Sequence, residues 1–309
     1  MNIACPMIAQ VHRQCPSVIE GLAINAINSV LRNSRLLTCA VLSLHLALTA
    51  CSENEQPPQL GAFAYANATG HCPVGSRPGL VGATDGKISA DGIRYMVRTP
   101  SNYDATFAHP LLMIYAPAGQ SRWASERFVG LTTAATGAGF VVVYADHKQL
   151  NPVTVEQLGT IPGLVAKEWC IDEKRMFVTG HSDGGTASLA LAVLDKTKKI
   201  PAVIAPSAAG WTGKDLDSFQ CRDPLPVMIM HSKNDSLFPG WGSQTSAWWA
   251  GCNHCDVTKT KSVEGGCRAY QGCASGGATL YCEGTGSHRD WPNLNRVMLE
   301  FFTHPEKFQ

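Results

Sequence analysis

The 309-residue chain has no excess of charge of either sign. It contains 25 lysines and arginines against 24 aspartates and glutamates, and no basic stripe or basic tail. Nucleic-acid-binding proteins carry such a basic surface, so nucleic acid is not an expected partner. Internal repeats and low-complexity blocks are also absent. With 45% hydrophobic residues, a domain of about 250 residues would bury an ample core.

The chain also lacks an apolar run long enough to cross a bilayer comfortably. Residues 36–50 are apolar apart from His45, which is short for a membrane-spanning helix. Two arginines precede this run and small residues end it, so residues 1–50 are interpreted as a secretory signal segment. Because the residues before Val30 are atypical of a signal, we hypothesise that translation starts near residue 30.

The end of the predicted signal indicates how the mature chain begins. The sequence Leu48-Thr49-Ala50-Cys51 resembles the bacterial lipobox, in which the cysteine is lipidated. Residues 51–75 would then be a polar tether and the entry to the folded domain. The expected location is the bacterial cell envelope, at the periplasm or cell surface, with a lipid anchor at Cys51 in the membrane. The alternative is a plain signal peptide cleaved near Ala50.

Cysteine usage agrees with export. Eight cysteines follow Cys51, at positions Cys72, Cys170, Cys221, Cys252, Cys255, Cys267, Cys273 and Cys282. An even number in an exported chain predicts up to four disulfides, with 105 possible pairings. The segment Cys252-Asn253-His254-Cys255 has the local spacing of two zinc ligands, so zinc is the alternative to disulfides. The oxidising compartment favours disulfides, so no metal is expected.

The stretch Val178–Gly185 has the pattern Gly-x-Ser-x-Gly. An apolar strand-like run precedes it and the helical segment 186–194 follows it. In such a turn the two glycines avoid clashes, and Ser182 stands exposed at the apex as a candidate nucleophile. The N–H of Asp183 would point to where an oxyanion forms. The alternative is a glycine-rich turn with an incidental serine.

Buried strands alternate with helices along the rest of the chain. Apolar runs predict strands at residues 111–115, 140–145, 176–179, 202–205, 226–231 and 279–282, with an edge strand within 88–98. Helices are expected at 128–136, 160–169, 186–194, 246–250 and 295–302. This alternation predicts an α/β fold with a mostly parallel sheet and helices on both faces. Residues 76–309 would form one catalytic domain.

A serine nucleophile needs a base and a carboxylate that orients the base. Asp235 and His288 follow later predicted strands, and the chain order Ser182, Asp235, His288 is that of the α/β-hydrolase fold. His181 should point away from the site, and His231 should be buried and structural. Asp290 is too close in sequence to His288 to orient it.

The second oxyanion donor should lie in the loop after residues 111–115. Pro117 has no N–H, so Ala118 is the candidate, with Gly119 as the alternative. Tryptophans are candidates for an aromatic wall, although most tryptophans simply pack. The ones considered are Trp123, Trp211, Trp241, Trp248, Trp249 and Trp291, of which Trp211 and Trp291 are our substrate-binding candidates.

Several of these segments carry a resemblance to a family. The chain resembles the secreted feruloyl-esterase and polyhydroxybutyrate-depolymerase group of α/β-hydrolases, including its bacterial lipoproteins, over residues 88–300. The matching pieces are 111–121, 170–185, 231–239, 249–255, 270–273, 286–288 and 291–292. Two departures are Ala116-Pro117 in place of His-Gly, and two residues between His288 and Trp291-Pro292 in place of one.

The resemblance implies a serine esterase that needs no metal or organic cofactor. Ser182 would be the nucleophile, His288 the base and Asp235 its partner, and Cys255 would pair with Cys273. The implied substrates are small or polymeric esters of the feruloyl or hydroxyalkanoate type. A serine peptidase and a non-catalytic ligand-binding lipoprotein are the alternatives. The oligomeric state and the acyl specificity are left open.

Overall fold

The computed structural model describes residues 70–309. The predicted signal segment, the hypothesised start near residue 30, the lipidation site Cys51 and most of the tether lie outside the described residues. Within the described part, no helix combines the length and the apolar character that a membrane crossing requires.

Strands and helices alternate through the middle of the chain, as the sequence predicts, whereas three strands come before the first α-helix and three come between the last two. The strands are β1 Ala83–Ile88, β2 Arg94–Arg98, β3 His109–Tyr115, β4 Val141–Ala145, β5 Ile171–His181, β6 Val203–Ser207, β7 Val227–Ser232, β8 Asp256–Val263, β9 Cys267–Gln271 and β10 Thr279–Gly284. The α-helices are α4 Arg122–Val129, α5 Thr132–Gly137, α6 Pro152–Glu168, α7 Asp183–Val193, α8 Gly213–Leu216, α9 Trp241–Cys252 and α10 Asn295–Thr303. Two short 3₁₀ turns are η1 Glu264–Gly266 and η2 Pro305–Phe308.

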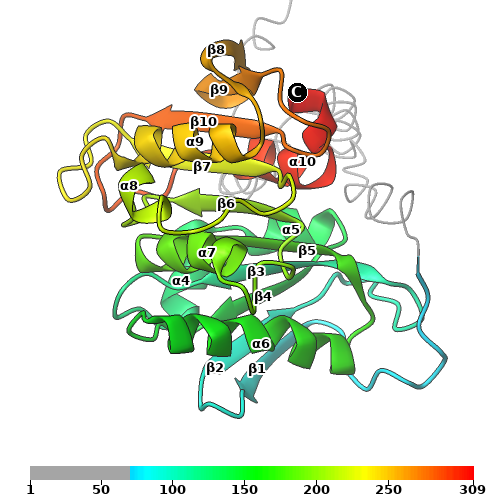
Figure 1. Cartoon of the computed structure of the whole chain (residues 1–309). Coiled ribbons are helices and arrows are strands. Elements are labelled where there is room, and N and C mark those ends of the chain that lie inside the picture. Colours follow the sequence, from blue (N-terminus) through cyan, green and yellow to red (C-terminus); the bar gives the residue numbers. More distant parts are fainter. Residues whose placement is uncertain (1–69) are drawn as a thin grey trace, which may run out of the picture. The chain divides into compact units, whose positions relative to one another are not determined.

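The strands form a single ten-stranded sheet in the order β1-β2-β4-β3-β5-β6-β7-β10-β9-β8 (Figure 1). The six strands from β4 to β10 in this order pair in parallel, and the two strands at each edge pair antiparallel. The prediction of a mostly parallel sheet is therefore confirmed. Because the parallel strands all end at one edge, the loops that follow them are brought together there.

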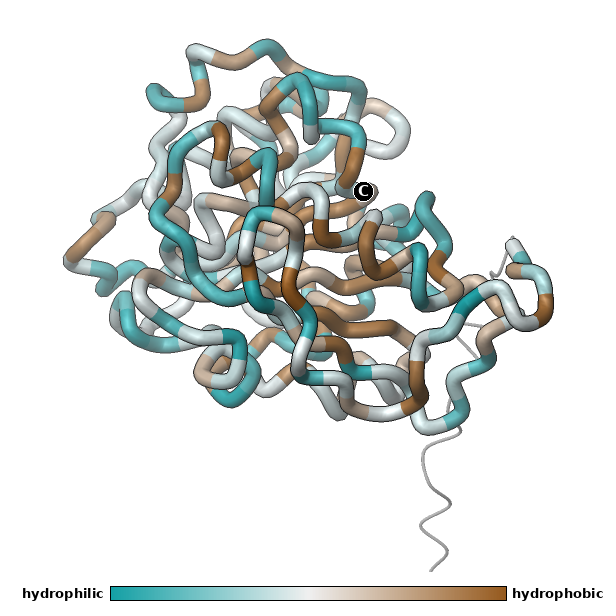
Figure 2. Tube along the Cα trace, turned by 90° about the horizontal axis from the view of Figure 1, so that it is seen from below, coloured by the Kyte–Doolittle hydropathy of each residue, from teal (hydrophilic) through white to brown (hydrophobic). Residues whose placement is uncertain are grey.

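Helices cover both faces of the sheet. Buried residues of α6, α7 and α9 pack with one face, as Leu158, Leu191 and Trp249 show. Buried residues of α5 and α10 pack with the other face, including Ala135 and Phe302. Figure 2 shows apolar residues concentrated along the central strands, with polar residues in the surrounding loops. The central strands are buried on both sides, which explains why their sequences are continuous apolar runs.

Helix α6 begins well before the start of the helix predicted at 160–169. The side chain of Asn151 accepts a hydrogen bond from the N–H of Thr154 at 2.9 Å, and Pro152 occupies the first turn. Both features favour a helix start there. Pro162 therefore lies inside the helix, where it cannot donate to the carbonyl of Leu158. The hydroxyl of Tyr115 donates to that carbonyl instead, at 3.3 Å.

The helix predicted at 128–136 is two helices. Gly130 ends α4 in the left-handed conformation, with φ of 59°, and α5 begins at Thr132. Glycine adopts this conformation without the steric penalty of a Cβ atom.

Four disulfides link the described chain. They join Cys72 to Cys170, Cys221 to Cys252, Cys255 to Cys273, and Cys267 to Cys282. Cys252 and Cys255, which were considered as zinc ligands, therefore belong to separate disulfides. This density of disulfides fits an exported protein.

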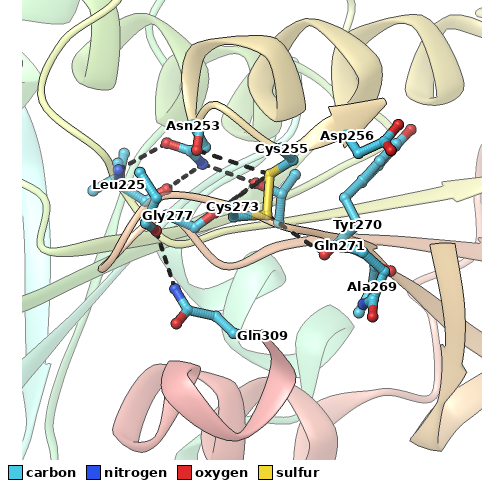
Figure 3. The surroundings of a disulfide bond; sticks show 12 residues. Leu225, Asn253, Cys255, Asp256, Ala269, Tyr270, Gln271, Cys273, Gly277 and Gln309 are labelled. Atoms are coloured by element: carbon cyan, nitrogen blue, oxygen red, sulfur yellow. Dashed lines mark hydrogen bonds between the residues drawn. A yellow bond between two sulfur atoms is a disulfide. The ribbon is translucent and has the colours of Figure 1, made fainter. Parts of the chain in front are cut away.

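The disulfide between Cys255 and Cys273 lies beside a buried asparagine (Figure 3). Asn253 accepts from the N–H of Leu225 at 3.0 Å and donates to the carbonyl of the same residue at 2.7 Å. The Asn253 amide also donates to the hydroxyl of Thr279 at 2.8 Å. The end of α9 is thus tied to the loop before β7 and to the start of β10.

Candidate active site

Ser182 lies at the turn between β5 and α7. Its φ is 56° and its ψ is −118°, a conformation that is rare for a residue with a side chain. A Cβ atom on Gly184 would lie 2.0 Å from the carbonyl oxygen of Tyr115, and one on Gly180 would lie 2.5 Å from the backbone of Gly184. Only glycine fits these two positions, so the pattern around Ser182 is required by the close approach of the backbone.

The structure brings the three residues of the predicted triad together. The hydroxyl of Ser182 lies 2.9 Å from Nε2 of His288, and Nδ1 of His288 lies 2.7 Å from Oδ2 of Asp235. Asp235 follows β7 and His288 follows β10, and these two strands are parallel neighbours. The three side chains are 53 and 106 residues apart in sequence, and they meet because their loops leave the same edge of the sheet.

Asp235 is buried and accepts hydrogen bonds on both carboxylate oxygens. Oδ1 accepts from the backbone N–H groups of Leu237 and Phe238, each at 2.9 Å. Burial raises the pKa of Asp235, but the hydrogen bonds from His288 and Phe238, together with nearby histidine charge, leave the pKa below its ordinary value. The carboxylate is therefore ionised at neutral pH. It accepts from Nδ1–H of His288, which leaves Nε2 free to accept from Ser182.

His231 supports the loop that carries Asp235. It is buried at the end of β7, as its position in the sequence predicts. Its Nε2 lies 2.8 Å from the carbonyl oxygen of Phe238 and 3.6 Å from Oδ2 of Asp235. Because a carbonyl only accepts, Nε2 carries the proton and donates to Phe238.

The sequence predicted that His181 points away from the site, and this prediction is wrong. Its ring lines the cavity in front of Ser182. Nε2 lies 2.6 Å from the carbonyl oxygen of His288, and Nδ1 lies 3.0 Å from the hydroxyl of Ser207. Nε2 therefore donates to His288, and Nδ1 accepts from Ser207. Burial lowers the pKa of His181 to about 4, so this ring is neutral at pH 7.

A cavity of about 460 Å³ opens at the three side chains. Its lining is partly apolar, with Phe128 and Leu237, and carries one cation, Arg289. The complete lining is Pro117, Ala118, Gln120, Ser125, Phe128, His181, Ser182, Leu237, His288 and Arg289. Concave sites of this volume and character suit small organic ligands.

The two predicted oxyanion donors come from different segments of the chain. Asp183 is the first residue of α7, and Ala118 lies in the loop after β3 and lines the cavity. Among the described residues, no backbone carbonyl accepts from either N–H. The carboxylate of Asp183 accepts a hydrogen bond from Nε2 of His147 at 2.8 Å.

The two tryptophans predicted to bind substrate lie outside the lining of this cavity. Trp211 stacks on Phe219 with ring centroids 5.4 Å apart, beside a separate cavity of about 150 Å³. Trp291 packs edge-on against Phe128 and His181, and its indole N–H donates to Asn295 at 2.7 Å. Trp291 therefore supports residues that line the larger cavity.

Between Gly70 and Gln309, no three His, Cys, Asp or Glu side chains cluster in a way that could hold a metal ion. No family model matches the chain.

Solved structures with a similar arrangement establish the fold. The acetyl xylan esterase from Aspergillus awamori superimposes with a TM-score of 0.57 at 14% identity, over 72% of this chain and 99% of that structure. The fluorophosphonate-binding serine hydrolase F of Staphylococcus aureus gives a TM-score of 0.50 at 13% identity, over 73% and 99%. The chain has the α/β-hydrolase fold, as the sequence predicts.

Curated relatives of similar sequence are named feruloyl esterases or probable feruloyl esterases. Feruloyl esterase C of Emericella nidulans is 26% identical over 230 residues, which cover 69% of this chain and 82% of the relative. Feruloyl esterase D of Neurospora crassa is 26% identical over 256 residues, covering 75% and 84%. The probable feruloyl esterase C of Aspergillus oryzae is 29% identical over 207 residues, covering 62% and 72%. The chain is a carboxylic ester hydrolase. Its resemblance to the feruloyl-esterase group is confirmed.

Proposed function

We propose that the chain hydrolyses esters through an acyl-enzyme formed on Ser182, with His288 as base and Asp235 as the residue that orients the base. One observation carries this proposal. The hydroxyl of Ser182, the imidazole of His288 and the buried carboxylate of Asp235 form a continuous hydrogen-bonded series with distances of 2.9 and 2.7 Å. Such a series makes an ordinary alcohol nucleophilic.

The proton moves along this series in both halves of the reaction. His288 Nε2 takes the proton of Ser182 as Oγ bonds to the acyl carbon, and Asp235 stabilises the resulting imidazolium. His288 then gives that proton to the alkoxide leaving group, which departs as the alcohol. Water next attacks the acyl-enzyme while His288 again removes a proton, and Ser182 is released as the hydroxyl. The reaction balances with the protein's own side chains and water.

The developing oxyanion is proposed to accept hydrogen bonds from the N–H groups of Asp183 and Ala118. Both lack a backbone acceptor among the described residues; Asp183 directly follows Ser182, and Ala118 lines the same cavity as Ser182. Preorganised donors of this kind are worth about 10²- to 10³-fold in kcat each.

The proposed substrates are esters of hydroxycinnamic acids such as ferulic acid. The names of the curated relatives support this choice, and so does the partly apolar lining by Phe128 and Leu237. Hydroxyalkanoate esters belong to the same resemblance and form the second arm of the test.

The test compares methyl ferulate, p-nitrophenyl butyrate and hydroxybutyrate oligomers as substrates for the wild type and Ser182→Ala. We expect methyl ferulate to be hydrolysed by the wild type and not measurably by the variant. Hydrolysis of hydroxybutyrate oligomers in preference to methyl ferulate would replace the hydroxycinnamate proposal. Equal rates for the wild type and Ser182→Ala would overturn the proposed mechanism.

We also propose that the protein is exported and held to a bacterial membrane by a lipid on Cys51. The lipobox-like residues 48–51 and the four disulfides support this. Cells expressing the full chain and labelled with a radioactive fatty acid should yield a labelled membrane-bound protein. Cys51→Ser should lose the label, and an equally labelled Cys51→Ser variant would contradict the anchor.

A further inference from the structure

His147 contacts two loops that leave different strands. It follows β4, and its backbone N–H donates to the carbonyl of Gln120 at 3.0 Å. Its ring Nε2 donates to Oδ2 of Asp183 at 2.8 Å. Since the sheet order is β4-β3-β5, the loop after β4 crosses the end of β3 to reach the turn after β5.

Each loop that His147 contacts carries one proposed oxyanion donor. The N–H of Gln120 donates to the carbonyl of Pro117 at 3.0 Å, which closes a turn with Ala118 and Gly119 at its centre. Gly119 has φ of 68°, a value that glycine adopts readily. The hydrogen bond from His147 to Gln120 therefore stabilises the turn that presents the N–H of Ala118. The other donor, Asp183, is held through its own side chain.

Asp146, which precedes His147, also binds the segment that follows β3. Asp146 accepts from the backbone N–H of Arg122 at 2.7 Å and from its guanidinium at 3.1 Å on both oxygens. The segment 146–147 thus contacts the loop after β3 on both sides of Ser121. These bonds hold the loop after β4, which carries the His147 ring, against the loop after β3.

We propose that His147 is a positioning residue that fixes the distance between the two oxyanion donors. This inference rests on the proposed function, because it assigns His147 a role only if Asp183 and Ala118 bind an oxyanion. The ring also holds the Asp183 carboxylate, which would otherwise be free to turn toward the developing negative charge and repel it. The donors matter in the transition state, so loss of the ring should lower kcat and leave KM nearly unchanged.

The experiment measures kcat and KM for methyl ferulate and p-nitrophenyl butyrate with His147→Ala, His147→Gln and Asp183→Ala. His147→Ala keeps the backbone bond to Gln120 and removes only the ring. We expect kcat to fall about five- to tenfold with KM within about twofold, as suits a donor that is displaced and not deleted. His147→Gln retains a side-chain donor and should recover part of the loss.

Two controls make the outcome decisive. His304→Ala removes another histidine–carboxylate contact, with Glu306 at 3.2 Å, and should leave kcat unchanged. Combining His147→Ala with Asp183→Ala should lower kcat no further than either change alone, because both break one bond. Thermal melting checks that each variant folds, and Asp183→Ala tests the same bond if His147→Ala does not fold.

Failure of this inference is distinct from failure of the proposed function. If Ser182→Ala is inactive while His147→Ala keeps the wild-type kcat, the positioning role is wrong and the triad stands. Additive effects of the two single changes, or a rise in KM without a fall in kcat, would also overturn the positioning role. If Ser182→Ala is as active as the wild type, the proposed function fails first.

Discussion

His181 lies directly before Ser182 and is held neutral beside the proposed base. Its Nε2–H donates to the backbone carbonyl of His288 at 2.6 Å, so it fixes the loop that carries the base and takes no proton itself. Sequence reasoning missed this contact because a strand residue next to a turn can face either side. Only the position of the loop after β10 decides which partner it meets.

The low pKa of His181 makes folding stability depend on pH. Its pKa is about 4 in the folded chain and about 6.5 when unfolded. Between these values the unfolded chain binds the proton and the folded chain does not, so acid favours unfolding. We expect His181 to contribute a loss of about 3 kcal/mol in unfolding free energy as pH falls from 7 to 4.

Urea unfolding of the wild type and His181→Gln at several pH values measures that contribution. The difference in unfolding free energy between the two proteins should shrink as pH falls from 6.5 toward 4. Other buried histidines contribute equally to both proteins and cancel in the difference. A difference that does not change with pH would show that His181 titrates as an exposed histidine.

Asp235 is predicted to act by fixing the tautomer of His288. Asp235→Asn keeps the size of the side chain but can donate to Nδ1, which favours the proton on Nε2. That tautomer cannot accept from Ser182, so kcat should fall by about 10³- to 10⁴-fold. The matched control is Asp256→Asn on β8, whose carboxylate contacts Thr258 and which should retain wild-type kcat. Steady-state kinetics would contradict this role if Asp235→Asn lost less than tenfold.

Helix α6 has one backbone carbonyl whose hydrogen-bond donor comes from a strand and not from the helix itself. Pro162 leaves the carbonyl of Leu158 without its helical donor, and Tyr115 at the end of β3 supplies the bond. Tyr115 also borders the turn at Ser182, since its carbonyl closely approaches Gly184. The helix is therefore coupled to the strand that precedes the proposed oxyanion loop.

A double-mutant cycle tests this coupling. Tyr115→Phe leaves a buried carbonyl without a donor and should lower the unfolding free energy by about 1–3 kcal/mol. In a Pro162→Ala background the helix supplies its own N–H, so the same change should cost clearly less. Denaturant unfolding of the four proteins gives the coupling. Equal costs in the two backgrounds would mean that the hydroxyl does not serve the Leu158 carbonyl.

The elements that the sequence predicts well are those buried on both sides. The strands near 111–115, 140–145, 176–179 and 226–231 are recognisable because burial requires a continuous apolar run. Strand β8 has the sequence DVTKTKSV and is largely exposed, and β1 is similarly polar. Neither has the alternation that marks a strand, and their pairing with neighbours decides their structure.

The candidate active site also has a part that the sequence predicts and a part that it does not. Ser182, Asp235 and His288 can be predicted because each follows an apolar strand in a fixed chain order. The surroundings could not be predicted, since His147 and His181 act through backbone carbonyls and a carboxylate on distant loops. Trp211 and Trp291 were chosen by residue type, and residue type does not specify which cavity a side chain lines.

At the scale of the whole molecule, the disulfides differ in the length of chain that they close. Cys72 and Cys170 are 98 residues apart, whereas Cys255 and Cys273 are 18 apart. The first disulfide joins the beginning of the described chain to the residue before β5. Closing the longer loop restricts the unfolded chain more.

This difference predicts unequal stabilities for two double variants. Loop-closure entropy amounts to about 4.7 kcal/mol for the longer loop and about 3 kcal/mol for the shorter one. The Cys72→Ser/Cys170→Ser protein should therefore unfold at lower urea concentration than the Cys255→Ser/Cys273→Ser protein. The reverse order would show that native packing around the sulfur atoms outweighs loop length.

The proposed mechanism requires that His288 makes Ser182 nucleophilic. Its most direct test is mass spectrometry of the folded protein after a fluorophosphonate probe, with peptide mapping of the adduct. We expect one adduct per wild-type chain, located on Ser182, and no detectable adduct in His288→Ala under the same conditions. An adduct on another residue, or equal labelling of Ser182 without His288, would contradict it.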